Sequence, residues 1–205
     1  MRLLSILTVL LLLVACTKHR EIKIIGRNAV TGQGYDGLAY KVVSSKTGNY
    51  GEVYRTEATG NLDANGEAFV SIKQRKGRSY SLRVFEPSNN CYTNEVIQSF
   101  DSPYDVNGTF TFEFAECAYM KLHVHNLNCI DSNDEIKFRR LWLSTNESND
   151  FVIQSGCFQF DGDYFSLPIG NYKYEWYVTK NGVTTFHDSI FTLSANQYFD
   201  FTINY

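Results

Sequence analysis

Clusters of basic residues and recognisable catalytic motifs are both missing from this 205-residue sequence. The net charge is −3, with the two signs scattered along the chain. Nucleic-acid binding depends on clustered Lys and Arg, so a nucleic-acid partner is not expected. The motifs Gly-x-Ser-x-Gly and His-Glu-x-x-His are absent, and no spacing of Ser, His and Asp marks a catalytic triad. We therefore expect no enzymatic activity and no cofactor.

Long hydrophobic runs are scarce as well, and the one at the N-terminus is informative. Residues Leu3 to Val14 carry no charge and follow a single Arg. This run is shorter than the about 20 residues that a membrane-spanning helix needs, and it suits the apolar region of a signal peptide. It ends in Leu13-Val14-Ala15-Cys16, which resembles the lipobox of bacterial lipoproteins. The resemblance implies a signal peptide over 1–15 and a lipidated Cys16 that anchors the chain to a lipid bilayer. The alternative is an ordinary cleaved signal peptide.

The residues after Cys16 bear on localisation. Residues 16–20 are expected to form a short polar tether, since Thr17-Lys18-His19-Arg20 is polar and basic. Position 17 is not Asp, so the inner-membrane retention signal of enterobacterial lipoproteins is absent and the outer membrane is favoured. Some Bacteroidetes lipoproteins reach the cell surface through an acidic cluster at this point. The basic residues here favour the periplasmic side instead.

Four further cysteines, an even number, suit an oxidising compartment. Four cysteines allow three disulfide connectivities, and the sequence alone does not choose among them. If a domain boundary lies near residue 117, pairing within domains would join Cys91 to Cys117 and Cys129 to Cys157. Zinc is the alternative use of these thiols, but the chain contains no Cys-x-x-Cys spacing.

The rest of the chain predicts β-structure throughout. Pro and Met are rare, at 3 and 2 residues, whereas aromatic residues make up 15%. No helical periodicity appears after residue 20. Short runs of alternating apolar and polar residues are separated by turn dipeptides, a pattern typical of a sandwich or barrel. We therefore predict an all-β fold with two consecutive antiparallel β-sandwiches, of transthyretin-like or Ig-like type. The first covers 21–116 and the second 117–205, with the boundary at residues 115–118.

Individual strands are expected wherever alternation is clear. Asn181-Gly182 is the best hairpin signal, because it suits a type I′ turn with positive φ at both positions. The expected strands are Ile22–Gly26, Leu38–Ser45, Val53–Thr59, Glu67–Lys73, Ser79–Glu86, Phe110–Phe114, Tyr119–His125, Ile136–Leu143, Cys157–Phe160, Tyr164–Leu167, Tyr172–Thr179, Phe186–Leu193 and Tyr198–Ile203.

Several turns resemble those of a known superfamily. The relevant segments are Gly26 with Thr31-Gly32-x-Gly34, Asp63-x-Asn65-Gly66, Gly77-x-x-Tyr80 and Pro168-x-Gly170-x-Tyr172. They are similar to turns of the transthyretin-like, carboxypeptidase-regulatory-like β-sandwiches of secreted bacterial proteins. With the lipobox, the whole chain resembles a Bacteroidetes-type lipoprotein built of two such sandwiches. The resemblance implies a structural or adhesive role without catalytic residues.

One expected strand carries a candidate metal site. Tyr119–His125 has Met120, Leu122 and Val124 on one face and Lys121, His123 and His125 on the other. The two imidazoles lie about 7 Å apart along the strand. They could begin a zinc or copper site with His187 as a third ligand. Lys121 opposes a cation on this face, so a solvent-facing pair without a metal is the alternative.

Two acidic segments are further candidates for a site. Asp131-Ser-Asn133-Asp134-Glu135 gathers oxygen ligands as calcium sites do, but it lacks the spacing and the Gly of an EF-hand loop, so a polar turn is the alternative. Asp161 and Asp163 flank Gly162 in an expected tight turn. Catalytic carboxylates of glycosidases instead face each other across a cleft.

An aromatic ladder suggests a ligand of another kind. Tyr174 and Trp176 alternate along one face of an expected strand and could stack on a sugar if they are exposed; otherwise they belong to the core. We therefore expect a membrane-anchored envelope lipoprotein with a non-enzymatic structural or protein-binding, adhesive role. One alternative is a glycan-binding accessory lipoprotein of an outer-membrane uptake system. The other is a metal-dependent module that uses His123 and His125.

Overall fold

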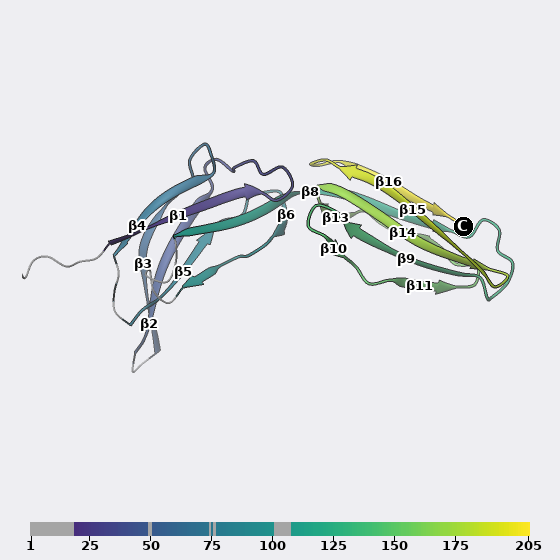
Figure 1. Cartoon of the computed structure of the whole chain (residues 1–205), viewed down its shortest axis with the longest axis horizontal. Coiled ribbons are helices and arrows are strands. Elements are labelled where there is room, and N and C mark those ends of the chain that lie inside the picture. The colour runs from purple at the N-terminus through teal and green to yellow at the C-terminus, as the bar shows by residue number, and fades with distance from the viewer. Residues whose placement is uncertain (1–18, 49–50, 74, 76, 101–107) are drawn as a thin grey trace, which may run out of the picture. The chain divides into compact units, whose positions relative to one another are not determined.

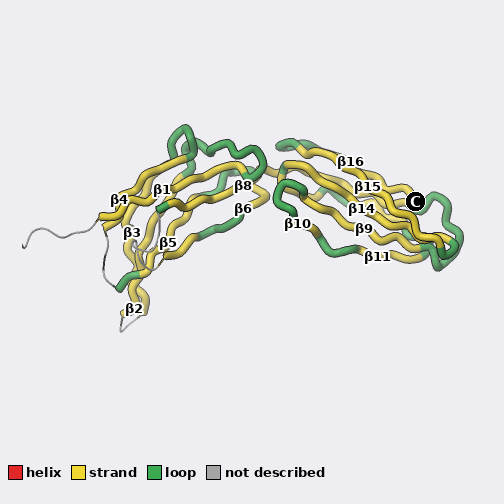
Figure 2. Tube along the Cα trace, in the orientation of Figure 1, coloured by secondary structure: helices red, strands yellow, loops and turns green. Residues whose placement is uncertain are grey.

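The computed structural model confirms the all-β fold (Figures 1 and 2). It describes residues 19–48, 51–73, 75, 77–100 and 108–205, and these form strands, turns and loops without a helix. Thus no helix that could cross a membrane occurs in the described part of the chain. The predicted signal peptide over 1–15, the lipidation site Cys16 and the first residues of the 16–20 tether lie outside the described residues.

The chain divides into two compact units. Unit 1 comprises residues up to Arg27, Gln33–Phe85 and Glu95–Phe112, and unit 2 comprises Asn28–Gly32, Glu86–Asn94 and Glu113–Tyr205. The strands are β1 (His19–Asn28), β2 (Ala39–Gly48), β3 (Gly51–Asn61), β4 (Glu67–Lys73), β5 (Ser79–Val84), β6 (Asn90–Thr93), β7 (Gln98–Phe100), β8 (Thr109–His125), β9 (Glu135–Trp142), β10 (Glu147–Ser148), β11 (Val152–Ser155), β12 (Gln159–Asp161), β13 (Phe165–Pro168), β14 (Gly170–Lys180), β15 (Val183–Leu193) and β16 (Tyr198–Asn204).

Unit 1 contains two groups of paired strands. Strand β1 pairs antiparallel with β4 and lies next to β8, while β3, β2, β5 and β7 follow one another in a four-stranded sheet. Alternate residues are buried in both groups, as in Ile22 and Ile24 of β1 and Tyr80 and Leu82 of β5. The ring of Phe100 lies 5.0 Å from that of Phe110, which joins the two groups in one core. Strand β4 has the bounds that were predicted from its alternating residues, so that prediction is confirmed.

Unit 2 is a sandwich of two sheets. In one sheet β8 pairs antiparallel with β12 and β13 on one side and parallel with β16 on the other. The second sheet has the order β10–β9–β14–β15, with β11 also paired to β9. Buried side chains from both sheets, including Met120 and Val124 of β8 and Tyr172 and Tyr174 of β14, form a single core. The β14–β15 hairpin confirms the predicted turn, since φ is 51° at Asn181 and 72° at Gly182.

Strand β8 differs from its expected form. Phe110–Phe114 and Tyr119–His125 were predicted as separate strands on either side of a boundary at 115–118, but β8 runs unbroken through both. Ala115, Cys117 and Ala118 are buried, so this stretch is part of a core and is not a linker. The passage from unit 1 to unit 2 falls between Phe112 and Glu113.

The predicted domain over 21–116 also contains segments that the structure groups elsewhere. Residues Glu86–Asn94 belong to unit 2, because β6 pairs with β8 at residues 114–116 and Cys91 is bonded to Cys117. Asn28–Gly32 belongs to unit 2 as well, and the amide of Ala29 donates to the carbonyl of Phe114. Strands β6, β7, β10 and β11, each of 4 residues or fewer, were not predicted.

Candidate functional site

Two disulfides lie in unit 2. Cys91–Cys117 joins β6 to β8, and Cys129–Cys157 joins the loop after β8 to the residues before β12. These are the pairs that follow from pairing within domains. The two disulfides close loops of 26 and 28 residues, and each contributes about 3–4 kcal/mol to stability in the chain-entropy model. Disulfides of this kind persist in oxidising compartments, which agrees with export.

The outer face of β8 carries the histidine pair. Met120, Leu122 and Val124 are buried in the core, as predicted, and the intervening side chains are only partly covered. The side chains of His123 and His125 are 20% and 27% exposed, so both rings can be reached from solvent.

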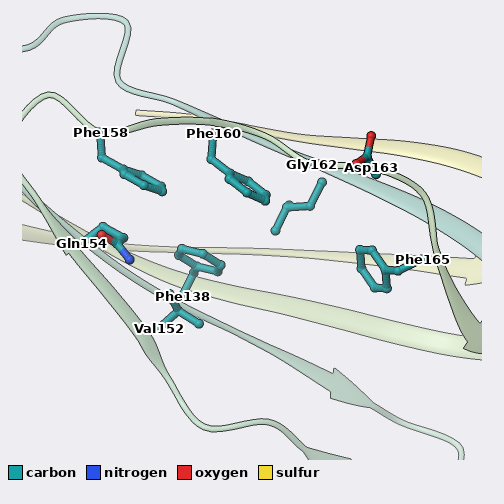
Figure 3. A pocket seen from close by; sticks show the side chains of 9 residues that line it. Phe138, Val152, Gln154, Phe158, Phe160, Gly162, Asp163 and Phe165 are labelled. Atoms are coloured by element: carbon teal, nitrogen blue, oxygen red, sulfur yellow. The ribbon is translucent and has the colours of Figure 1, made fainter.

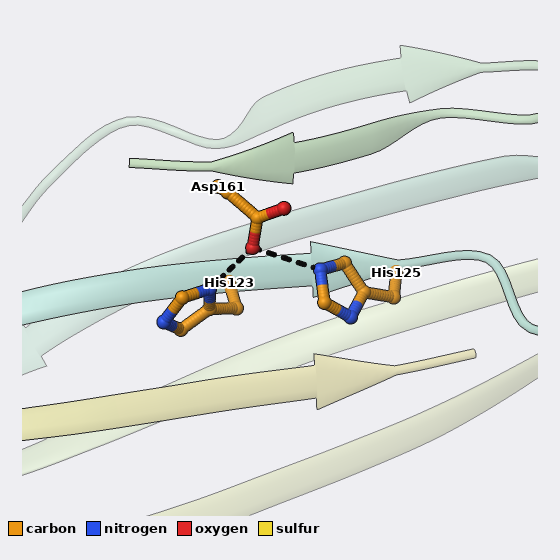
Figure 4. A group of neighbouring side chains, drawn as sticks. All are labelled: His123, His125 and Asp161. Atoms are coloured by element: carbon orange, nitrogen blue, oxygen red, sulfur yellow. Dashed lines mark hydrogen bonds and ion pairs between the residues drawn. The ribbon is translucent and has the colours of Figure 1, made fainter. Parts of the chain in front are cut away.

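A carboxylate from the neighbouring strand completes this group (Figure 4). Strand β12 pairs with β8 so that Asp161 lies directly opposite His123. One carboxylate oxygen of Asp161, Oδ1, contacts Nδ1 of His123 and lies 3.0 Å from Nε2 of His125. Hydrogen bonds from His123 first, and then from His125, hold the pKa of Asp161 below its ordinary value, because they favour the ionised carboxylate.

The sequence did not reveal this partner. The sequence suggests Asp161 only as a possible catalytic carboxylate with Asp163, and it suggests His187 as the third metal ligand. His187 lies on β15, in the other sheet of unit 2, where its ring stacks on Trp176 at a centroid distance of 5.6 Å. It is not a member of the group formed by His123, His125 and Asp161.

The acidic segment Asp131–Glu135 forms a polar turn. Asp134 is fully buried, and its Oδ2 accepts hydrogen bonds from the backbone amide of Ile130 and from Nδ2 of Asn126. These two bonds, in that order, lower the pKa of Asp134. Oδ1 of Asp131 accepts from the amide of Asn133. The carboxylates thus organise the loop itself, which fits the polar-turn alternative to calcium.

The aromatic pair proposed for sugar stacking does not present an open platform. Tyr174 is 4% exposed, and its ring stacks on Phe201 and Phe191 at centroid distances of 4.8 and 6.1 Å. Trp176 is partly buried, with its ring stacked on His187. This corrects the sugar-binding prediction for Tyr174, because the packing of the two sheets places its side chain in the core.

An apolar pocket of about 450 Å³ opens in unit 2, between β11 and the segment that contains β12 and β13. Figure 3 shows aromatic side chains from both sheets directed into one space. Phe160, Phe165 and Val152 are 43%, 37% and 43% exposed. The lining residues are Leu122, Phe138, Val152, Gln154, Phe158, Phe160, Gly162, Asp163 and Phe165.

Sequence reasoning missed this pocket. Its residues come from short segments between Leu122 and Phe165, and only the pairing and packing of the two sheets bring these segments together. A local signal is the clustering of Phe158, Phe160 and Phe165 in a short stretch of sequence, where β12 and β13 span only 3 and 4 residues.

No family model matches this sequence, and no curated protein matches it. Similar solved structures include the TIE protein of Bacillus anthracis (12% identity, TM-score 0.34) and a streptococcal ancillary pilin (16% identity, TM-score 0.35). The comparison covers 91% and 93% of this chain, but only 33% and 63% of those two proteins. The shaft pilin SpaA of Lactobacillus rhamnosus GG is also similar, with 9% identity, a TM-score of 0.36, and coverage of 91% of this chain and 98% of SpaA. The transthyretin-like resemblance and the Bacteroidetes-type lipoprotein assignment remain predictions.

Proposed function

We propose that this chain is a lipid-anchored protein of the bacterial envelope that binds an extended segment of another protein in the pocket of unit 2. The observation that carries the proposal is the pocket itself. Apolar residues that form one exposed patch mark interaction sites more often than apolar residues that are exposed singly. Phe160 and Phe165 leave two aromatic rings open to solvent at its rim.

The strand that borders the pocket suits an extended partner. Within the described residues, β11 pairs with β9 and with no second strand, so its other edge is a template for a further strand. Val152 and Gln154, two residues apart on β11, both line the pocket. A polypeptide added along this edge would hydrogen-bond through its backbone and place alternate apolar side chains among the phenylalanines.

The anchor is proposed from the lipobox and supported by the disulfides. Acyl chains on Cys16 would hold the protein at a membrane, since burial of each CH₂ contributes about 0.8 kcal/mol and one chain alone holds only marginally. An oxidising compartment for unit 2 agrees with passage through a secretion pathway. Residues 16–18 would then connect the membrane to β1, because His19 and Arg20 of the expected tether are part of that strand.

Site-specific photocrosslinking in the producing cells tests the binding role. A photoreactive phenylalanine analogue at position 160 should give a discrete adduct, whereas the same analogue at Phe69, which is 64% exposed in unit 1, should not. Phe165→Glu should abolish the adduct formed from position 160. Identical adduct patterns from positions 160 and 69, or no adduct from position 160, would overturn the proposal.

Membrane fractionation tests the anchor separately. The wild-type chain should sediment with membranes, and mass spectrometry should find Cys16 acylated. Cys16→Ser should release the chain into the soluble fraction. An unacylated Cys16 in the membrane-bound protein would reject the anchor and leave the binding role to be judged by crosslinking alone.

A further inference from the structure

The donor atoms of His123, His125 and Asp161 converge on the outer face of the β8–β12 pair. One ring nitrogen of each histidine and one carboxylate oxygen all lie within 4.8 Å of one another. Figure 4 shows both rings turned toward the carboxylate, with the histidines on one strand and Asp161 on the next. We propose that these three side chains form a binding site for Zn²⁺ or Cu²⁺.

The separations suit a single ion after small side-chain rotations. Zinc binds imidazole nitrogen and carboxylate oxygen at about 2.0–2.2 Å, so ligand atoms around one ion lie roughly 3–4 Å apart. Asp161 Oδ1 and His125 Nε2 are 3.0 Å apart already. The Asp161 side chain is 64% exposed, so its carboxylate can turn without disturbing the core.

The backbone fixes the ligands to rigid elements. His123 and His125 are two residues apart on one strand, and the antiparallel register places Asp161 beside the first of them. The position of β12 is held at both ends. Cys157 is bonded to Cys129 just before it, and the amide of Gly162 just after it donates to the carbonyl of Leu122 at 3.0 Å. Ligands that are held in place before the ion arrives lower the entropy cost of binding it.

Three protein ligands leave one position of a tetrahedral ion for water. Three protein ligands with an open fourth position are usual for zinc sites that react or exchange ligands. On the other side of β8, the parallel register of β16 places Thr202 beside His123 and Asn204 beside His125, and both are exposed. Lys121 lies beside Asp200 in the same register, so an acidic residue accompanies the nearest lysine on this face.

The donor set selects the class of metal. Two imidazoles favour zinc, copper or nickel, whereas calcium and magnesium prefer sites made of oxygen ligands. Among these metals Cu²⁺ binds a given nitrogen and oxygen set most tightly. We therefore expect Cu²⁺ to bind more tightly than Zn²⁺, and Ca²⁺ not to bind these residues.

Isothermal titration calorimetry of the full chain, purified without reductant and stripped with chelator, tests the site. ZnCl₂ and CuCl₂ should each bind at one ion per chain. Asp161→Asn and His125→Ala should each weaken binding by at least about 10-fold, in line with the loss of a metal ligand or its partner. The matched controls are Asp163→Asn and His187→Ala, which remove the same groups outside the cluster and should leave affinity within about 2-fold.

Two further readouts separate a lost ligand from a lost fold. Zn²⁺ should raise the thermal midpoint of the wild type and of both controls but not that of Asp161→Asn, because a ligand stabilises only the state that it binds. Electron paramagnetic resonance of the Cu²⁺ complex should show coupling to two nitrogens, reduced to one in His123→Ala. Substoichiometric binding, or equal weakening by Asp161→Asn and Asp163→Asn, would overturn the site and show that Asp161 serves only as a hydrogen-bond acceptor for the two rings.

Discussion

The phenol of Tyr172 donates a hydrogen bond to the backbone carbonyl of Pro168, four residues earlier in the chain, at 2.7 Å. Tyr172 is 1% exposed and stacks on Trp142, so the bond fixes the turn between β13 and β14 from inside the core. Burial raises the pKa of Tyr172 well above its ordinary value, because the charged phenolate would be poorly solvated there.

Tyr172→Phe should lower the free energy of unfolding by about 1–2 kcal/mol. The ring stays in place, but the carbonyl of Pro168 loses its donor in a partly buried position. Denaturation by urea measures the change. Tyr198→Phe is the matched control, because Tyr198 is 63% exposed and its change should stay within about 0.5 kcal/mol. Equal losses in both variants would mean that the bond to Pro168 contributes nothing specific.

Asp134 should make stability depend on pH at the acid end. Its pKa is lower in the folded chain than in the unfolded chain, because Ile130 and Asn126 donate hydrogen bonds to the carboxylate. The resulting stabilisation is complete above the unfolded value of about 3.9 and is lost as the pH falls through the folded value. Asp134→Asn should therefore be less stable than the wild type at pH 7, and the difference should shrink as the pH falls below about 4. Unfolding curves of both proteins between pH 3 and pH 7 would measure the difference in their free energies of unfolding. A difference that stays constant over this pH range would contradict the prediction.

Substitution by Ala should lower stability to different extents at Gly66 and at Gly182. Both have positive φ, 74° and 72°, so Ala at either position carries a backbone penalty of about 1–2 kcal/mol. A Cβ at Gly66 would also lie 2.4 Å from the carbonyl oxygen of Gly26, whereas at Gly182 nothing lies within 4 Å. Gly66→Ala should therefore destabilise far more than Gly182→Ala. Thermal unfolding of the two variants compares them directly, and similar midpoints would show that the backbone around Gly66 gives way.

Opening one disulfide should destabilise unit 2 without abolishing its sheets. Replacing both Cys91 and Cys117 by Ser opens a closed loop of 26 residues and should lower the free energy of unfolding by about 3–4 kcal/mol. Peptide mapping under non-reducing conditions should still find Cys129 bonded to Cys157. Detection of Cys91 linked to Cys129 or Cys157 in the wild type would contradict the pairing.

Local patterns in the sequence were sufficient to predict the strands with strong alternation and their faces. Glu67–Lys73 was predicted with correct bounds, and Asn181-Gly182 identified its hairpin through the φ values that the turn demands. The faces of Tyr119–His125 followed from a period of two. In each case the information lies within a few neighbouring residues.

Features that depend on pairing between distant strands were missed. Asp161 meets His123 across 38 residues of sequence, and no local pattern specifies that β12 pairs with β8 in this register. The same limit applies to Tyr174. Alternation places it on the same side of its strand as Trp176, but only the packing of the second sheet decides that this side is the core. The unbroken course of β8 was missed because Ala115 and Ala118 interrupt the alternation of large residues.

The continuity of β8 limits how the chain can be divided for separate expression. A cut between residues 116 and 117 would split this strand and separate Cys91 from Cys117. The fragment 117–205 would then hold three cysteines, of which Cys129 and Cys157 have their native partner and Cys117 has none. A lone thiol in an oxidising medium invites dimers and scrambled bridges. Fragments that begin before Cys91 keep the cysteines of unit 2 even in number, and they retain the residues of β6 that pair with β8.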